Sequence, residues 1–312
     1  MSRKVATFRP EPHGKRLLGG EAHVFHCNFY NYWLQKTVLL VDGLGMEEVL
    51  VNAAASSAYA MLSGSARELE IGSLEGRRAL AQDSFGHLGF GIIDLAELGA
   101  EGGTVTLPVS HYGQCLRDAS GAAFARPQSL FDAGYAAGAA AFVFGCPLGT
   151  YASTIVQCMS LGADRGVIEL AARKEPLPVF PSAGAGAHWH GQPPRPNPDT
   201  SVDEGAVLAA LAQLGLVGNE EGLIPRFGVM LTNHFAHFYN RIAFVFHRRM
   251  ADTGMLEGAE ELLVDAGYRC AFNTFGGIMR SAEWDAVVRP MLRTKADWIH
   301  GMLAVANFLG WG

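Results

Sequence analysis

The amino-acid sequence predicts an α/β (α+β) protein, in which a mixed unit of helices and antiparallel sheet is followed by a second, mainly helical part. Three observations predict this class. Apolar residues recur at helical spacing in several long stretches and at strand spacing in shorter ones, and every strand-like stretch precedes a proline-rich break at 174–200. The length of 312 residues and the 49% hydrophobic composition allow a large buried core.

The predicted elements differ on the two sides of the break. Before it, we expect helices over 27–41, 45–63 and 129–144 and strands over 85–97, 103–112, 150–159 and 165–172. After it, Ser201 and Glu204 have the spacing of a capping box and predict a helix from Asp203 to Leu214, followed by helices over 226–251, 257–276 and 281–309. We therefore expect an α/β domain over 1–173, a proline- and glycine-rich linker over 174–200, and a helical second repeat over 201–312 that packs on the first.

Charge and composition exclude several classes of partner. The 24 Lys and Arg residues are fewer than the 30 Asp and Glu residues and are scattered, so nucleic acid is not expected to bind. No stretch reaches the roughly 18 consecutive apolar residues of a membrane span, and the first residues lack an apolar leader. The five cysteines are widely spaced and form no CxxC pair, which favours reduced thiols. These features together indicate a soluble, cytoplasmic protein.

Two parts of the chain resemble one another. Phe29-Tyr30-Asn31 recurs as Phe238-Tyr239-Asn240, and the glutamate pair Glu47-Glu48 recurs as Glu260-Glu261 after a similar interval with a short insertion. Self-similarity of this kind indicates a repeated structural unit. Two alanine-rich helical hairpins could mimic part of the match, so the duplication is a hypothesis.

The repeated signature contains the best candidates for ligand binding. Tyr30, Asn31, Tyr239 and Asn240 place hydroxyl and amide groups beside apolar helical positions, where they could recognise a polar group on an apolar ligand. His111 joins them because it ends a strand-like run, and side chains at strand ends commonly reach a pocket. The alternative is structural, since buried Tyr and Asn often serve only as hydrogen-bonded core groups or caps.

A second set of residues could hold a metal ion. His23, His26 and Cys27 crowd the start of the predicted first helix, and His234 and His237 are three residues apart, which would place them on one helix face. Such a histidine pair binds a transition metal such as Fe or Zn when further ligands arrive from elsewhere. The histidines do not align between the two copies, which argues against a shared metal site, and a core role beside aromatic residues is the alternative.

One stretch of sequence resembles a known family. It comprises VSHYGQCL (109–116), the glycine- and alanine-rich segment SLFDAGYAAGAAAFVFG (129–145) and the paired segments YASTIVQCMSLGADRGVIELAA (151–172). These segments are similar, in order and character, to the 4-vinyl reductase domain family of small-molecule-binding domains. The resemblance covers roughly 25–173, with a partial second copy at about 226–312. It implies that Gly134 and Gly138 allow close helix packing.

The resemblance also implies a function. It implies a pocket between helices and sheet that accepts an aromatic or hydrocarbon-like molecule. Zinc-bearing family members have a Glu ahead of two spaced cysteines, but here Cys158 has neither that Glu nor the second Cys nearby, so their zinc is not expected.

Two functional hypotheses follow. The first is binding of a small, largely apolar or aromatic molecule, with a homodimer as a further candidate partner. The alternative is a metal-dependent enzyme, of oxygenase, lyase or hydrolase type, with a His/Cys cluster at the repeat interface. Whether the protein is an enzyme stays open on the sequence.

Overall fold

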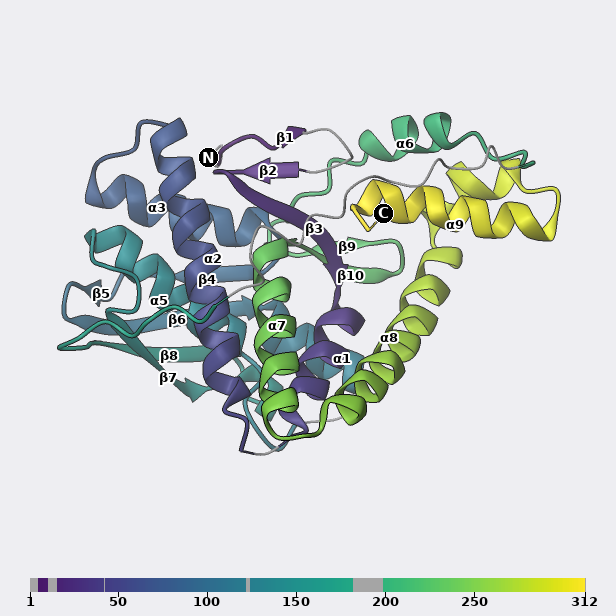
Figure 1. Cartoon of the computed structure of the whole chain (residues 1–312). Coiled ribbons are helices and arrows are strands. Elements are labelled where there is room, and N and C mark those ends of the chain that lie inside the picture. The colour runs from purple at the N-terminus through teal and green to yellow at the C-terminus, as the bar shows by residue number, and fades with distance from the viewer. Residues whose placement is uncertain (1–4, 11–15, 42, 122–123, 182–198, 312) are drawn as a thin grey trace.

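The computed structural model describes residues 5–10, 16–41, 43–121, 124–181 and 199–311. Helices and two antiparallel sheets alternate along the chain, as Figure 1 shows. The mixed class predicted from the sequence is confirmed. Most of the predicted linker, residues 182–198, lies outside the described residues.

The first sheet combines strands from the part before the linker with strands from the part after it. Its strand order is β1-β2-β3-β10-β9, with bounds β1 Arg9–Pro10, β2 Arg16–Leu18, β3 Glu21–Cys27, β9 Ile224–Arg226 and β10 Val229–Phe235. β3 and β10 pair antiparallel, with Cys27 opposite Leu231 and His23 opposite Phe235. The part before the linker and the part after it therefore share one hydrogen-bonded sheet.

The second sheet belongs to the first part alone. Its order is β4-β6-β8-β7, with β5 pairing β6, and its bounds are β4 Gly91–Asp94, β5 Leu98–Gly99, β6 Gly102–Ser110, β7 Tyr151–Gln157 and β8 Gly166–Ala172. α2 (Met46–Glu68), α3 (Leu74–His87) and α5 (Leu130–Phe144) pack beside it and against one another. β6 continues into a π-helical turn, His111–Cys115, and then α4 (Leu116–Ser120).

Small residues bring α2 and α5 into close contact. A Cβ atom added to Gly134 would lie 2.2 Å from the carbonyl oxygen of Val51, and one added to Gly138 would lie 2.3 Å from that of Ala55. Both glycines therefore allow backbone contacts that a side chain would block. This confirms the packing role that the sequence indicated for Gly134 and Gly138.

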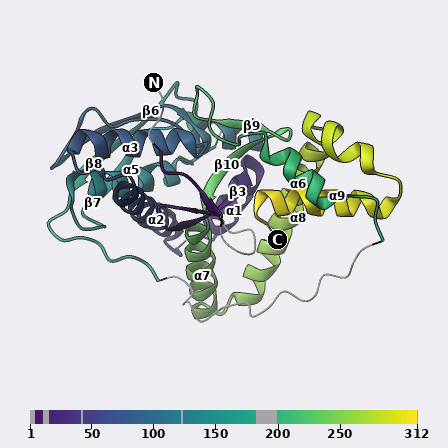
Figure 2. The same cartoon turned by 90° about the horizontal axis from the view of Figure 1, so that it is seen from above.

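The two similar sequence segments adopt the same order of elements. β3 leads into α1 (Asn28–Leu39) and then α2, while β10 leads into α7 (Ala236–Asp252) and then α8 (Leu256–Met279). The helices pack reciprocally, because α1 lies against α8 and α7 lies against α2 (Figures 1 and 2). This exchange brings the two Phe-Tyr-Asn signatures together, with the rings of Tyr30 and Tyr239 5.2 Å apart.

A smaller core closes the C-terminal end. α6 (Glu204–Ala212) packs on α9 (Lys295–Leu309), with a π-helical turn, Trp284–Val288, and a 3-10 turn, Arg289–Met291, before it. Phe25 and Cys27 of β3 join Trp284 and Phe308 in this core. None of the described helices is both long and apolar enough to cross a membrane.

Several sequence predictions of secondary structure are wrong in detail. The sequence prediction has no strand over 21–27, but His23, His26 and Cys27 lie on β3, which leads into the helix predicted over 27–41. The helix predicted over 226–251 begins only at Ala236, because β10 precedes it there and carries His234. His234 and His237 consequently do not share a helix face. These strands run straight into helices with no capping side chain at Cys27 or Phe235, so the usual signal of a helix start is absent.

Other predicted boundaries also differ from the observed ones. The stretch predicted as a strand over 85–97 begins inside α3 and contains only β4. α6 is capped by Asp203, whose side chain accepts from the Ala206 N–H, rather than by Ser201. The helix predicted over 281–309 is interrupted, because Pro290 cannot donate a helical hydrogen bond.

Candidate functional site

Asn31 lies at the centre of a buried hydrogen-bond network that joins the two strand–helix–helix segments. Its side-chain oxygen accepts a hydrogen bond of 2.6 Å from the Tyr239 hydroxyl. Its side-chain nitrogen donates to Nε2 of His111 over 3.0 Å and to the Thr232 hydroxyl over 3.3 Å. All four residues are buried, so each bond satisfies a polar group that water does not reach. Three of the sequence-predicted ligand-binding residues thus meet at one point.

The protonation of His111 follows from this network. Burial lowers the pKa of His111 to about 3, so its ring is neutral near pH 7. Because Nε2 accepts from the Asn31 amide, the ring proton sits on Nδ1. Nδ1 is buried and has no hydrogen-bond partner among the described residues.

A second buried histidine extends the network. Nδ1 of His234 accepts the backbone N–H of Phe235 over 2.9 Å, so Nε2 carries the proton and donates to the Tyr112 hydroxyl over 2.8 Å. The Tyr112 hydroxyl also hydrogen-bonds Tyr239. Burial lowers the pKa of His234 well below its ordinary value and raises the pKa values of both tyrosines. His234 therefore donates to Tyr112 on one side of this pair of tyrosines, and Tyr239 donates to Asn31 on the other.

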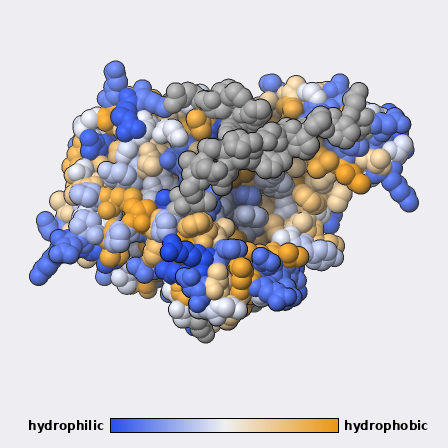
Figure 3. All heavy atoms as spheres, in the orientation of Figure 1, coloured by the Kyte–Doolittle hydropathy of each residue, from blue (hydrophilic) through white to orange (hydrophobic). Residues whose placement is uncertain are grey.

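An apolar cavity lies beside this network. Its volume is about 240 Å³, and one wall comes from α8, another from the junction of β3 and α1, and a third from the chain end. On the face in Figure 3 the surface is hollowed between α7 and α8. The lining residues are His26, Tyr30, Gly267, Cys270, Ala271, Thr274, Phe275 and Trp311; we call this space the aromatic cavity.

The rings of the aromatic cavity are arranged in a regular way. His26 stacks on Tyr30 with centroids 3.7 Å apart and an interplanar angle of 9°, and it lies nearly parallel to Trp311 at 6.0 Å and 17°. Tyr239 meets His26 edge to face at 4.6 Å. His26 and Tyr30 thus connect the cavity wall to the Asn31 network through the Tyr239 ring.

His26 supplies a polar atom within this apolar surrounding. Its Nδ1 is buried and has no hydrogen-bond partner among the described residues. Burial lowers the pKa of His26 to about 3, which keeps the ring neutral. A neutral imidazole beside an apolar cavity can accept or donate one hydrogen bond, depending on its tautomer.

Two thiols contact the hydroxyl group of Thr274 at the wall of the aromatic cavity. The Thr274 hydroxyl is 3.0 Å from Sγ of Cys27 and 3.6 Å from Sγ of Cys270. Burial alone would raise the pKa of the Cys27 thiol, but hydrogen bonds from Cys270, Thr274 and the N–H groups of Tyr30 and Phe29 lower it to about 7. All five cysteines are free.

A second cavity of about 420 Å³ lies between α2, α5 and the second sheet. Its lining is more polar than that of the aromatic cavity and includes Glu47, Glu48 and Arg173 beside apolar positions of α5. This cavity has the location that the family resemblance implied, between helices and sheet, but it lacks a set of stacked rings.

The predicted metal-binding residues do not converge on one ion site. Nδ1 of His23 contacts the backbone oxygen of Asn233 over 3.3 Å, and both ring nitrogens of His234 are engaged as described above. Among the described residues, no group of three or more His, Cys, Asp or Glu side chains could hold a metal ion.

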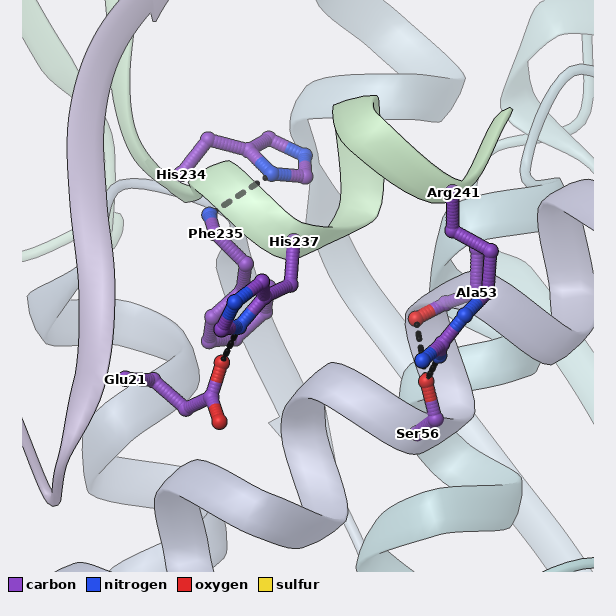
Figure 4. Close-up of polar contacts among 7 residues, drawn as sticks. All are labelled: Glu21, Ala53, Ser56, His234, Phe235, His237 and Arg241. Atoms are coloured by element: carbon purple, nitrogen blue, oxygen red, sulfur yellow. Dashed lines mark hydrogen bonds and ion pairs between the residues drawn. The ribbon is translucent and has the colours of Figure 1, made fainter. Parts of the chain in front are cut away.

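His237 and Asn240 lie on the exposed face of α7, away from the buried Phe238 and Tyr239. His237 points away from His234 and pairs with Glu21 over 2.6 Å, as Figure 4 shows, and its side chain is 56% exposed. The same figure shows Arg241 reaching Ser56 of α2. Asn240 is exposed as well, so it does not join Asn31 in the buried network.

Several residues of the site were missed by the sequence reasoning. Trp311 and Phe275 of the cavity and Tyr112 and Thr232 of the network come from elements whose positions next to β3 only the fold determines. One local signal was available for Tyr112, which directly follows His111.

Comparisons with known proteins add little to this geometry. No family model matches the chain, and no curated protein matches it either. A similar solved structure is the crystal structure of the phenol-responsive sensory domain of the transcription activator PoxR with phenol. The two chains are 16% identical, the match covers 53% of this chain and 84% of that one, and the TM-score is 0.44. The candidate site is therefore assigned from the geometry of this chain alone.

Proposed function

We propose that this protein binds a small, largely apolar aromatic molecule of one or two rings in the aromatic cavity. The observation that carries the proposal is the set of near-parallel rings, His26, Tyr30 and Trp311, on the wall of an apolar space. A flat ring gains both buried apolar area and stacking from such a wall.

The size of the cavity supports a small ligand. Drug-sized ligands occupy pockets of roughly 300–1,000 Å³, whereas an apolar cavity of about 150 Å³ already binds benzene. The volume of about 240 Å³ lies between these cases. One or two fused rings fit this range, and a larger tetrapyrrole does not.

The polar atoms near the cavity indicate what the ring can carry. His26, Tyr30 and Thr274 are lining residues whose side chains carry groups that can meet a ligand hydroxyl or N–H. Because these groups are neutral, a phenol or an indole suits the cavity better than a charged carboxylate. The Asn31 network supports the wall from behind by holding the Tyr239 ring against His26.

The test is a titration with single aromatic compounds. We expect phenol, indole and naphthalene to bind with changes in tryptophan fluorescence, and aliphatic acids of the same size to bind more weakly. Phe275→Ala should weaken binding, while the matched control Phe272→Ala, on the same helix and 73% exposed, should not. No saturable binding of any of these compounds by the folded protein would contradict the proposal.

A further inference from the structure

We propose that Cys27 and Cys270 form a redox-sensitive pair, in which a peroxide that enters the aromatic cavity converts the two thiols into one disulfide. The thiols come from β3 and α8, far apart in sequence, yet both contact the Thr274 hydroxyl, Cys27 at 3.0 Å and Cys270 at 3.6 Å. Disulfide formation requires two sulfur atoms at close range, which this arrangement provides.

The positions of the two thiols define how an oxidant reaches them. Cys27 is fully buried, whereas Cys270 lines the aromatic cavity. A small oxidant such as hydrogen peroxide therefore meets the sulfur of Cys270 first. Cys27 lies directly behind it and is the thiol that reacts, because its pKa is lowered while that of Cys270 is raised, so Cys270 is the resolving thiol.

The chemistry balances with hydrogen peroxide as the only co-reactant. The sulfur of Cys27 attacks one peroxide oxygen, the O–O bond breaks, and the thiol becomes a sulfenic acid while water leaves. The sulfur of Cys270 then attacks the sulfenic sulfur, the S–S bond forms, and the hydroxyl group leaves with the Cys270 proton as a second water. Two thiols are oxidised by two electrons and one peroxide is reduced to two waters.

The bond would join the two strand–helix–helix segments covalently. It would link the β3–α1 junction of the first segment to α8 of the second, at the wall of the aromatic cavity. A cross-link between distant positions restricts the unfolded chain strongly. Oxidation should therefore raise the thermal stability and replace the contacts of Thr274 with the free thiols.

The experiment is peptide mapping by mass spectrometry of the full chain after treatment with hydrogen peroxide, without reductant. We expect one linked peptide pair containing Cys27 and Cys270, a loss of about 2 Da from the intact mass, and a higher Tm that reductant reverses. Cys270→Ser should abolish all three changes. Cys146→Ser is the matched control, because Cys146 is partly buried and contacts Tyr151 rather than a thiol.

Outcomes of the opposite kind would overturn the inference. If peroxide oxidises Cys146 while Cys27 and Cys270 remain two separate thiols, the pair is not redox-sensitive. The wild-type map decides this even if Cys270→Ser folds poorly. No ligand enters the measurement, so its failure is distinguishable from failure of the proposed ligand binding.

A different observation carries a second inference, which concerns the outer face of α8. Val264, Tyr268 and Phe272 follow one another at helical spacing and are 72%, 72% and 73% exposed. They lie opposite the buried positions Ala259 and Ala266. Figure 3 shows hydrophobic side chains at the surface over α8. Three large apolar side chains in a row on an exposed helix face mark an interaction surface.

The internal similarity indicates which packing partner is missing from the outer face of α8. When Glu260-Glu261 is matched with Glu47-Glu48, Val264 and Tyr268 correspond to Val51 and Ala55 of α2. Those two positions of α2 are covered by α5, through the close contacts of its glycines. On α8 no described helix covers the corresponding face, which leaves Val264 and Tyr268 72% exposed.

We infer that a second copy of this chain covers the outer face of α8, with the two α8 helices antiparallel. The charges favour this occupant, because the first half of α8 carries Glu257, Glu260 and Glu261 besides the Asp265 that pairs with Arg269 in the same helix, while Arg280 lies just after its second half. An antiparallel pair places the acidic first half of each helix beside the Arg280 end of the other. The same patch then serves both copies, as a two-fold interface requires.

Sedimentation equilibrium tests this dimer. We expect the full chain to be dimeric at roughly 10–100 µM, and Tyr268→Glu to shift it to monomer by at least about tenfold in Kd. Val156→Glu, at a residue 50% exposed on β7, is the control and should leave the dimer intact. A wild-type chain that is monomeric throughout this range, or a Tyr268→Glu variant with unchanged Kd, would overturn the inference.

Discussion

The Tyr239 hydroxyl donates a hydrogen bond of 2.6 Å to the side-chain oxygen of Asn31, and so joins the second Phe-Tyr-Asn signature to the first. The relationship is not reciprocal, because Tyr30 stacks on His26 at the aromatic cavity and Asn240 is exposed. Similar sequences thus build two different local structures. One signature supplies the polar hub and a cavity ring, while the other supplies the tyrosine that holds the hub in place.

Asn31→Ala should destabilise the fold. The substitution leaves the Tyr239 hydroxyl and Nε2 of His111 buried without their partner, and an orphaned buried group costs about 1–3 kcal/mol. We expect a loss of this size in the free energy of unfolding, measured by denaturant titration, and a loss of ligand affinity of more than about 1 kcal/mol. Asn240→Ala, at an exposed position of α7, should cost less in both quantities. Equal losses in the two variants would show that the network has no special role.

Trp311→Ala should weaken binding of an aromatic ligand. The indole forms one wall of the aromatic cavity, and its N–H donates to the backbone oxygen of Phe25, which holds the ring in place. Loss of the stacking surface should lower the affinity by about tenfold or more, which corresponds to about 1.4 kcal/mol. Calorimetric titration of indole into the variant measures this effect. Trp311→Phe retains a ring and should keep most of the affinity; if both variants bind like the wild type, the ligand lies elsewhere.

Much of the fold could be predicted from local patterns, and the failures at β3 and β10 share one cause. α2, α5 and α8 have long apolar periodicity, and β7 and β8 have clear strand composition, so these elements were expected close to their observed bounds. β3 was missed, and β10 was included in the helix predicted over 226–251, because neither strand is separated from its helix by a glycine, a proline or a capping side chain.

The candidate site could be predicted only in part. Tyr30, Asn31, His111 and Tyr239 were found because they combine polar groups with apolar neighbours, and the structure brings the last three into one network. Trp311 belongs to the site only because the chain end returns to β3, which no local pattern encodes. The predicted histidine pair separated because its first member lies on a strand, whose side-chain period differs from that of a helix.

Gly138→Ala should destabilise the protein, although alanine favours helices. The new Cβ atom would lie 2.3 Å from the carbonyl oxygen of Ala55, so α2 and α5 would have to separate. Overpacking of this kind costs about 1–3 kcal/mol. The matched control is Gly258→Ala in α8, where a Cβ atom meets nothing within 4 Å, and a gain of about 0.4–1 kcal/mol is expected. Denaturant titration of the two variants should show opposite signs; losses in both would contradict the packing argument.

Acid should unfold the protein through its buried histidines. Burial lowers the pKa values of His23, His26 and His111 to about 3 and that of His234 well below its ordinary value. The unfolded chain therefore binds more protons than the folded chain between pH 3 and about 6.5, so stability is complete above this window and falls as the pH falls through it. Asp132 acts in the opposite direction, because burial raises its pKa to about 7 and the folded state holds its proton. The four histidines take up more protons on unfolding than Asp132 releases, so a net uptake of about three protons is expected near pH 5.

The free energy of unfolding measured between pH 8 and pH 4.5 checks this balance. His111→Gln should make the dependence shallower by about one proton, because it removes one buried titrating ring while an amide can still meet Asn31. His237→Gln is the control: Glu21 raises the pKa of His237, which is a weak effect of opposite sign at a half-exposed position. A free energy of unfolding that stays constant from pH 8 to pH 4.5 would mean that the four imidazole rings are solvated or paired in the folded protein. His111 and His234 would then not be held neutral, and the donors and acceptors assigned to them in the hydrogen-bond network would be wrong.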